Sequence, residues 1–249
     1  KGTSEGNIYS GYANLTTAIF HGWMADDSPR NIASVGHRRW ALNPEMGATG
    51  FGEYKGQGVM FALDDSNVTN VNNYDAIAYP SGAAFPTELF LGDFPWSVAI
   101  NPERYEVTDP SKLKVTLEKG SKKWVFTLKD SKFNGNYMSY DTAGYGIPLN
   151  IVFRPKDITN YMGMYEVTVE GLQNLSGQKM VLQYKTTFFS KDNPASSTLT
   201  PLERADELAL VPTELNKDFS KVITRAEFSK LAVMLYEKLN GPITPTVTF

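Results

Sequence analysis

The residues best suited to chemistry surround a single histidine. The string Gly36-His37-Arg38-Arg39-Trp40 is soon followed by Asn43-Pro44, where a helix should stop. Because an unperturbed imidazole titrates near neutral pH, His37 is a candidate general base or metal ligand. Two carboxylates upstream, Asp26 and Glu5, are candidates for a base that would act together with His37.

Metal binding at His37 would need more ligands than the sequence offers. A zinc site requires three or four convergent side chains, and His37 is the one good candidate. The chain has no cysteine, which excludes thiolate ligands and disulfides. We therefore expect no cofactor and keep zinc at His37 only as an alternative. The simplest alternative role for His37 is a structural one, in which a backbone carbonyl satisfies the ring.

The neighbours of His37 have mainly structural interpretations. We expect Arg38 and Arg39 to be ion-paired or solvated, with anion binding as the alternative. Trp23 and Trp40 are expected to pack in the core. His21 falls off the apolar stripe of its predicted helix, so it should lie at the surface.

One helix and two strands are expected to position His37. Apolar residues recur every three or four positions, as on one face of a helix. They are Ile8, Tyr12, Leu15, Ile19 and Trp23. The helix should start between Ser10 and Asn14, either of which could cap it, and should stop near Pro29. Residues 48–52 and 59–63 are then predicted to be strands.

The Gly36-His37-Arg38 string, with Trp23 upstream and Gly50-Phe51-Gly52 downstream, resembles the second half of a CAP domain. This superfamily comprises cysteine-rich secretory proteins, antigen 5 and pathogenesis-related-1 proteins, and is also called SCP-like. The resemblance covers residues 4–64 and is closest to a variant found in Gram-positive bacteria. It implies an α-β-α sandwich whose cleft gathers two histidines and two acidic residues.

The resemblance assigns three residues of this chain to that cleft. His37 stands at the family's Gly-His position. Asp26 lies three residues after Trp23, where many members carry glutamate. Glu5, in the string Glu5-Gly6-Asn7-Ile8, is displaced by one from the acid of the family's Gly-Glu-Asn-Ile motif. The family's first histidine would precede Lys1, so we expect half of the cleft to be absent or altered.

Beyond the turn-rich residues 64–82, the pattern becomes that of β-structure. Residues 113–118 alternate between apolar and polar, and Lys119-Gly120-Ser121-Lys122 should turn this strand into a second one. We expect Trp124 of the second strand to be buried between two sheets. Further strands through residue 189 predict an antiparallel, immunoglobulin-like sandwich. An alternative use of its tyrosines is a carbohydrate platform made of Tyr137, Tyr140, Tyr145, Tyr161 and Tyr165.

The tail resembles one S-layer homology (SLH) repeat through its string Ile223-Thr224-Arg225-Ala226-Glu227-Phe228. The resemblance implies binding to a wall polymer, with Arg225 among the contacts, and we place Glu227 beside it as a second contact. The structural alternative is that Thr224 and Glu227 only form a capping box and Arg225 is only a surface charge. An earlier capping box is expected at Thr200-Pro201-Leu202-Glu203.

Charge and hydropathy exclude two classes of partner. Lysine and arginine total 24 against 27 aspartate and glutamate, so the net charge is −3. No basic run exceeds two residues, and we therefore expect no nucleic acid partner and no anionic membrane surface. No apolar run approaches the roughly 18 residues of a membrane span.

These patterns predict an α+β multidomain protein in three parts. The parts are a partial α-β-α CAP-like layer at 1–70, an antiparallel immunoglobulin-like β-sandwich at 71–192 and an SLH-like helical module at 193–249. We expect a secreted, extracellular bacterial protein, attached to the cell wall or cell surface, with a non-catalytic binding role.

The expected partners follow from the same division. The SLH-like repeat should bind cell-wall polysaccharide, and the CAP-like cleft should bind a small molecule, a glycan or a protein. One alternative function is an extracellular hydrolase that is metal-assisted or uses His37 with an acid. The other is a structural spacer at the surface.

Overall fold

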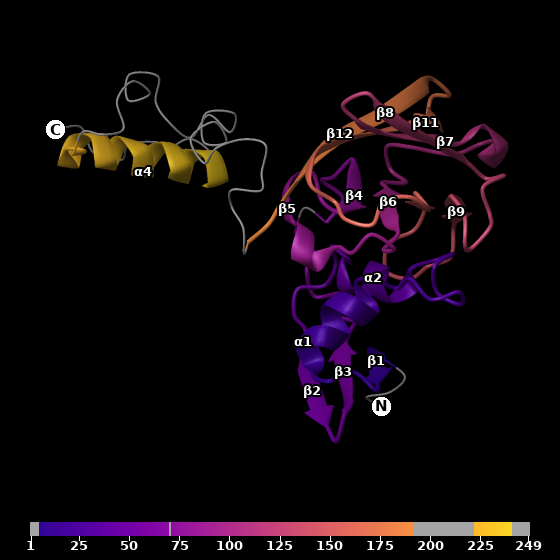
Figure 1. The fold of residues 1–249 in the computed structure, drawn as a ribbon, viewed down its shortest axis with the longest axis horizontal. Helices are drawn as coiled ribbons and strands as arrows, with labels where there is room; N and C mark the ends of the chain where they lie inside the picture. Colours follow the sequence, from indigo (N-terminus) through magenta and orange to yellow (C-terminus); the bar gives the residue numbers. More distant parts are fainter. Residues whose placement is uncertain (1–4, 70, 192–221, 241–249) are drawn as a thin grey trace. The chain divides into compact units, whose positions relative to one another are not determined.

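The structure, a computed structural model, describes residues 5–69, 71–191 and 222–240. The chain forms two compact units, residues 1–192 and 193–249, and each is described by itself. Figure 1 shows the elements of the first unit and the helix of the second. The predicted boundary at 70 and 71 falls inside the first unit, and the three-part division stays a prediction.

The chain begins with a small antiparallel sheet, sheet A, in the order β1-β3-β2. Its strands are β1 (Gly6–Ser10), β2 (Phe51–Tyr54) and β3 (Gln57–Phe61). Successive side chains of a strand point to opposite faces, so Asn7 and Tyr9 are buried while Ile8 is exposed. Gly11, with a φ of 89°, follows the strand in a conformation that favours glycine.

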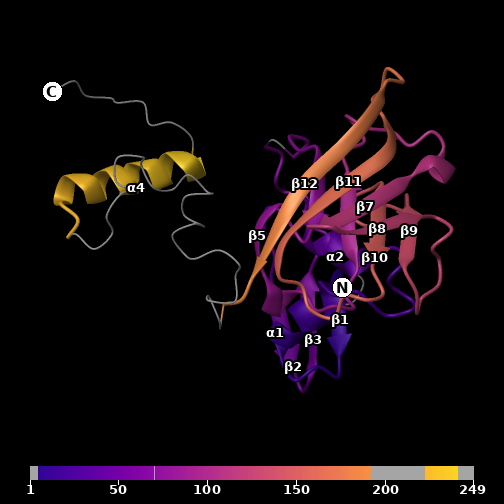
Figure 2. The ribbon, with the colours of Figure 1, turned by 45° about the horizontal axis from the view of Figure 1, so that its top comes forward.

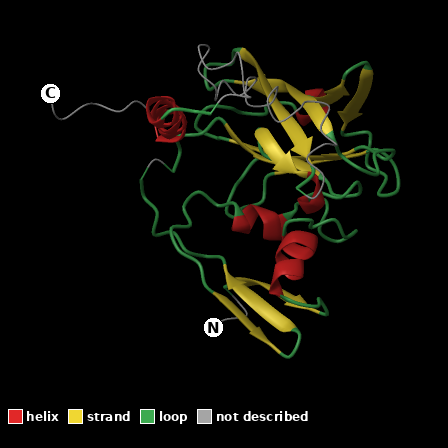
Figure 3. Ribbon diagram, turned by 60° about the vertical axis from the view of Figure 1, so that its left-hand side comes forward, coloured by secondary structure: helices red, strands yellow, loops and turns green. Residues whose placement is uncertain are grey.

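Three short helical segments lie beside sheet A. They are α1 (Leu15–Ala18), the π-helix η1 (Ile19–Trp23) and α2 (Gly36–Ala41). The predicted helix is confirmed from Leu15 to Trp23, and the Asn14 side chain caps it by accepting from the N–H of Thr17 at 2.9 Å. It is wrong for Ile8, which belongs to β1. Figure 3 shows the helical segments between sheet A and the larger sheets.

Two larger sheets complete the first unit. Sheet B has the order β4-β6-β10-β9, and sheet C has the order β5-β12-β11-β7-β8. Sheet B consists of β4 (Ala76–Tyr79), β6 (Trp96–Ile100), β9 (Tyr137–Asp141) and β10 (Asn150–Arg154). Sheet C consists of β5 (Ala83–Pro86), β7 (Lys114–Lys119), β8 (Lys122–Thr127), β11 (Gly163–Gln173) and β12 (Lys179–Phe189). The connections include the 3₁₀ turns η2 (Thr87–Leu89) and η3 (Pro110–Lys112). Figure 2 shows the long pair β11 and β12 side by side.

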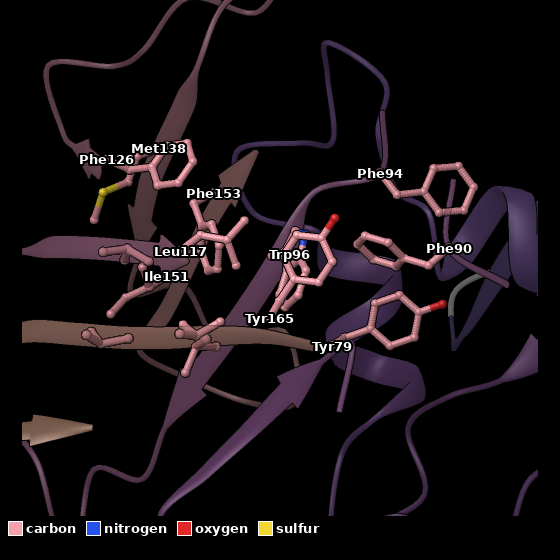
Figure 4. Packing of buried hydrophobic residues seen from close by; sticks show 14 of the residues in the cluster. Tyr79, Phe90, Phe94, Trp96, Leu117, Phe126, Met138, Ile151, Phe153 and Tyr165 are labelled. Carbon is pink, nitrogen blue, oxygen red and sulfur yellow. The ribbon is translucent and has the colours of Figure 1, made fainter. Parts of the chain in front are cut away.

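Sheets B and C share one core. Trp96 and Ile151 from sheet B and Leu117 from sheet C belong to the same buried cluster, part of which Figure 4 shows. Burying such a side chain stabilises the fold by about 1.5–3 kcal/mol. Tyr161 and Tyr165 are also buried in this cluster, so neither can serve an exposed carbohydrate platform.

The hairpin predicted around Gly120 is confirmed. β7 pairs antiparallel with β8, and Gly120 adopts a φ of 56° in the turn. Burial of Trp124 between the sheets is wrong in part, because this side chain is only half-buried while Phe126 on the same strand is fully buried. Strand β8 lies at the edge of sheet C, where the Trp124 Nε1–H donates to Oδ1 of exposed Asp157 at 2.7 Å.

The predicted α+β multidomain fold is wrong. In the described part of the first unit most of the regular secondary structure is strand, arranged in three sheets, and the helices are short. An α-β-α layer needs helices on both faces of a sheet. The outward face of sheet A instead leaves Ile8 and Phe61 45% and 40% exposed. Sheet B is antiparallel as predicted, but sheet C is not purely so, because β5 pairs with β12 in parallel.

In the second unit the structure describes α4 (Arg225–Asn240) and the three residues before it. Its predicted apolar face begins at Phe228, which is exposed, while the side chains of Leu235 and Leu239 lie outside the described part. The capping box predicted at Thr200-Pro201-Leu202-Glu203 also lies outside it. Within the described ranges no helix has the length and apolarity of a membrane span.

Candidate functional site

Asp26 and His37 meet at the start of α2. The Oδ1 atom of Asp26 lies 2.9 Å from Nδ1 of His37, and Oδ2 accepts a 2.9 Å hydrogen bond from the backbone N–H of His37. The Asp26 side chain is 1% exposed and the His37 side chain is 37% exposed. A buried carboxylate therefore orients an imidazole that reaches solvent.

Two residues at this site, Asp26 itself and Val35, have unusual backbone conformations. Asp26 has a φ of 46° and Val35 a φ of 43°, a region that is costly for residues other than glycine and most of all for β-branched ones. Val35 occupies the N-cap of α2 and has no side-chain oxygen with which to cap the helix. The Asp26 carboxylate supplies that cap from outside the helix, so one acid both caps α2 and orients the ring of His37.

The hydrogen bond that the ring of His37 donates to Asp26 raises the pKa of His37 above its usual value, and burial opposes the shift. A carboxylate beside an imidazolium favours the charged ring, so the pair is an ion pair below the raised pKa. With Nδ1 directed at Asp26, Nε2 is the ring nitrogen left for proton exchange with another group.

Asn7 is a member of the site that the sequence analysis missed. Its Nδ2 donates to the backbone carbonyl of His37 at 2.8 Å, and the side chain is buried. The feature that could have indicated it is the alternation of strand β1, which places Asn7 on the same inward face as Tyr9. Glu5 is not brought into the site by any described contact. Its backbone carbonyl accepts from the N–H of Ala62 at 3.1 Å, which extends the pairing of sheet A.

Arg38 is not solvated or ion-paired as expected, because it is 0% exposed. Its guanidinium donates at 2.6–3.0 Å to four oxygens, the carbonyls of Met24, Ala25 and Pro95 and the hydroxyl of Ser97. Burial lowers its pKa to about 10. Because two of these carbonyls immediately precede Asp26, Arg38 fixes the loop that carries the acid to the start of β6.

Arg39 is also buried, and two of its carbonyl partners lie in the connection between β9 and β10. Its Nε donates to the carbonyl of Ile147 at 2.7 Å, and Nη2 donates to that of Ala143. Its ionic contact among the described residues is with Asp141, whose Oδ1 lies 3.5 Å from Nη1. Burial lowers its pKa. The two arginines therefore fasten α2 at both sides and leave neither guanidinium exposed for anion binding.

Of the other residues considered near His37, one is buried in the core and two are half-buried. Trp23 is buried as predicted, and its Nε1–H donates to the carbonyl of Ile8 at 3.2 Å. Trp40 is half-buried. The expected surface position of His21 is wrong in part, since this residue is half-buried with its ring 5.8 Å from that of Phe94.

The second predicted site lies at the start of α4. The N–H and hydroxyl of Thr224 donate to Oε2 of Glu227 at 2.8 and 2.7 Å, and the N–H of Glu227 donates back at 3.2 Å. This confirms the capping box, and its hydrogen bonds lower the pKa of Glu227. Arg225 beside them is exposed, and its guanidinium forms no ion pair within the described residues.

Among the described residues, no group of three or more histidine, aspartate or glutamate side chains is arranged to hold a metal ion. The Asp26–His37 pair thus offers two of the three or four ligands that zinc requires. Comparisons with protein-family models, with curated proteins and with solved structures find no match for this chain.

Proposed function

We propose that this chain is a secreted bacterial protein, attached to the cell wall or cell surface, with a non-catalytic binding role there. The observation that supports the proposal most directly is the exposed Arg225 in the first turn of α4. Thr224 and Glu227 satisfy each other in the capping box, so the helix start does not need the Arg225 side chain. Within the described residues no ion pair engages this guanidinium, so it is available for a ligand.

The chemistry of Arg225 points to an anionic polymer. A guanidinium offers up to five N–H donors and forms charge-assisted, often bidentate bonds to carboxylate or phosphate. The carboxylate of Glu227 is engaged by Thr224, which gives it a capping role and leaves Arg225 as the contact with the wall polysaccharide. One such contact binds weakly, and neighbouring repeats would raise the apparent affinity through effective concentration.

Co-sedimentation with purified cell walls tests this role. In a chain extended by further repeats, Arg225→Ala should lower the bound fraction while leaving the melting temperature unchanged, because exposed charges contribute little to stability. Thr224→Ala is the matched control, and it should destabilise α4 by about 1 kcal/mol through loss of its cap. Equal sedimentation with and without the Arg225 side chain would contradict the binding role, and the string from Ile223 to Phe228 would then be explained by the capping box alone.

The Asp26–His37 pair favours a second candidate, an extracellular hydrolase that uses His37 as a general base. The pair has the acid-to-imidazole hydrogen bond that such chemistry requires, and the ring reaches solvent. Hydrolysis of an activated ester should then fall to the background rate in His37→Gln. The chain has two histidines, so His21→Gln is the control for unspecific imidazole reactivity. Equal rates in the two variants would remove this candidate.

A further inference from the structure

A cleft of about 700 Å³, whose lining includes neither Asp26 nor His37, lies at one end of sheet B. Its walls come from residues 91–93 before β6, from 133–135 before β9 and from 154–156 at the end of β10, with Asp27 beside them. Its volume falls in the range of small-molecule sites, which often form where loops of several elements converge.

One part of the cleft is cationic. Arg154 is 8% exposed, and its guanidinium carbon lies 4.8 Å from the centre of the Phe133 ring. Its Nη1 donates to the carbonyl of Asp93 at 3.2 Å and its Nη2 to the carbonyl of Phe133. Both acceptors are neutral, so the guanidinium is held in place without a carboxylate in contact. Lys156, two residues further on, is exposed at the same cleft.

Two acids, Asp27 and Asp93, also line the cleft. Asp27 is half-buried, and burial, with a smaller contribution from Asp93, raises its pKa, while the charge of Arg154 opposes the rise. Within the described residues, none of these four charged side chains has an ion-pair partner within 4.0 Å. Two carboxylates and two cations therefore line one cleft without neutralising each other at contact distance.

We propose that this cleft binds a small zwitterion, namely an amino acid or a short peptide with free ends. The carboxylate of the ligand contacts Arg154 and Lys156, and its ammonium group contacts Asp27 and Asp93. The charges of buried Arg154 and half-buried Asp27 gain most from a partner of opposite sign, because water screens them less than it screens the exposed Lys156 and Asp93. Leu91 and Ile158 in the lining offer apolar surface to the ligand's side chain.

Calorimetric titration of the full chain with leucyl-leucine tests the proposal, with the N-acetylated and C-amidated dipeptides as blocked forms. The free dipeptide should bind, and blocking either end should raise Kd about tenfold or more, because each block removes one charged contact. Lack of binding up to about 10 mM, or equal binding of a blocked form, would overturn the zwitterion site.

Two variants locate the binding. Asp93→Asn keeps the backbone carbonyl that Arg154 uses and removes only the charge, and Lys156→Ala removes an exposed ammonium group. Each should raise Kd for the free dipeptide about tenfold. Asp93→Asn should add no further loss for the N-acetylated form, which has no ammonium group to lose. The exposed controls Asp65→Asn and Lys55→Ala, neither of which lines the cleft, should bind as the parent does, and affinities that are the same in all four variants would place the dipeptide elsewhere.

Discussion

At the scale of single residues, Asp26 has two roles that are usually divided between residues. One oxygen caps α2 and the other orients the ring of His37. The left-handed backbone at Asp26 and the burial of its carboxylate show that the fold holds this acid in one place. Any role of His37 in binding or in proton transfer therefore depends on Asp26 as its positioning residue.

The stability contributed by the pair should depend on pH. The folded-state pKa of His37 is raised above the unfolded value, so its contribution is complete below about pH 6.5 and is lost as pH rises through the raised pKa. Since His37 is more than a third exposed, the effect should be less than about 1 kcal/mol. Urea melts should show a larger loss of stability for His37→Gln near about pH 5.5 than near about pH 8.5.

Removal of the acid provides the control for this pH dependence. In an Asp26→Asn background, the larger loss near about pH 5.5 should vanish or reverse, because no carboxylate is left to favour the charged ring and burial then disfavours it. A larger loss at the lower pH that survives in that background would assign the effect to other groups.

At the scale of elements, signals carried by neighbouring residues were predictable and long-range partners were not. Asn14 as a cap, the turn at Gly120 and the Thr224–Glu227 box depend on residues a few positions apart. The Asn7–His37 bond spans 30 residues and the bond from Arg39 to Ile147 spans 108. Buried arginines contradict the ordinary preference of charged residues for the surface, so only a folded chain reveals their carbonyl partners.

Arg38 fastens α2 to the loop before Asp26 and to β6, so its loss should be severe. In Arg38→Met three backbone carbonyls lose a buried donor, and each unsatisfied group costs about 1–3 kcal/mol. We expect a loss of at least about 3 kcal/mol in urea unfolding. Arg38→Lys should not restore stability, because an ammonium group lacks the planar fork of donors. Arg30→Met, at an exposed arginine, is the control and should change stability little. An equally small change in Arg38→Met would contradict this role of Arg38.

Strand β8 offers a test of how burial is graded at a sheet edge. Phe126→Ala should cost about 3–5 kcal/mol, as for a fully buried aromatic. Trp124→Ala should cost about half as much, since its ring is half-buried and its N–H bonds to an exposed carboxylate. Chemical denaturation of both variants measures the order, and a larger loss at Trp124 would show that the edge of this sheet is covered.

At the scale of the whole molecule, the boundary between the two units comes directly after the last residues that are hydrogen-bonded to the rest of the first unit. The Glu88 carboxylate accepts from the hydroxyl of Ser190 at 2.6 Å and from the N–H of Lys191 at 2.8 Å, which ties the end of sheet C to η2. Arg38, Arg39 and the shared core likewise bind residues 24–39 to the larger sheets. The first 192 residues should therefore unfold as one cooperative body.

Dividing the chain after residue 192 tests both the unit structure and the proposed function. Residues 1–192 keep every contact described for the first unit, so the fragment should melt within about 2 °C of the corresponding transition in the full chain. Residues 193–249 should retain the weak wall binding proposed for Arg225, and residues 1–192 should not sediment with purified walls. If both fragments fold and only residues 1–192 sediment with the walls, the binding role belongs to the first unit and not to α4.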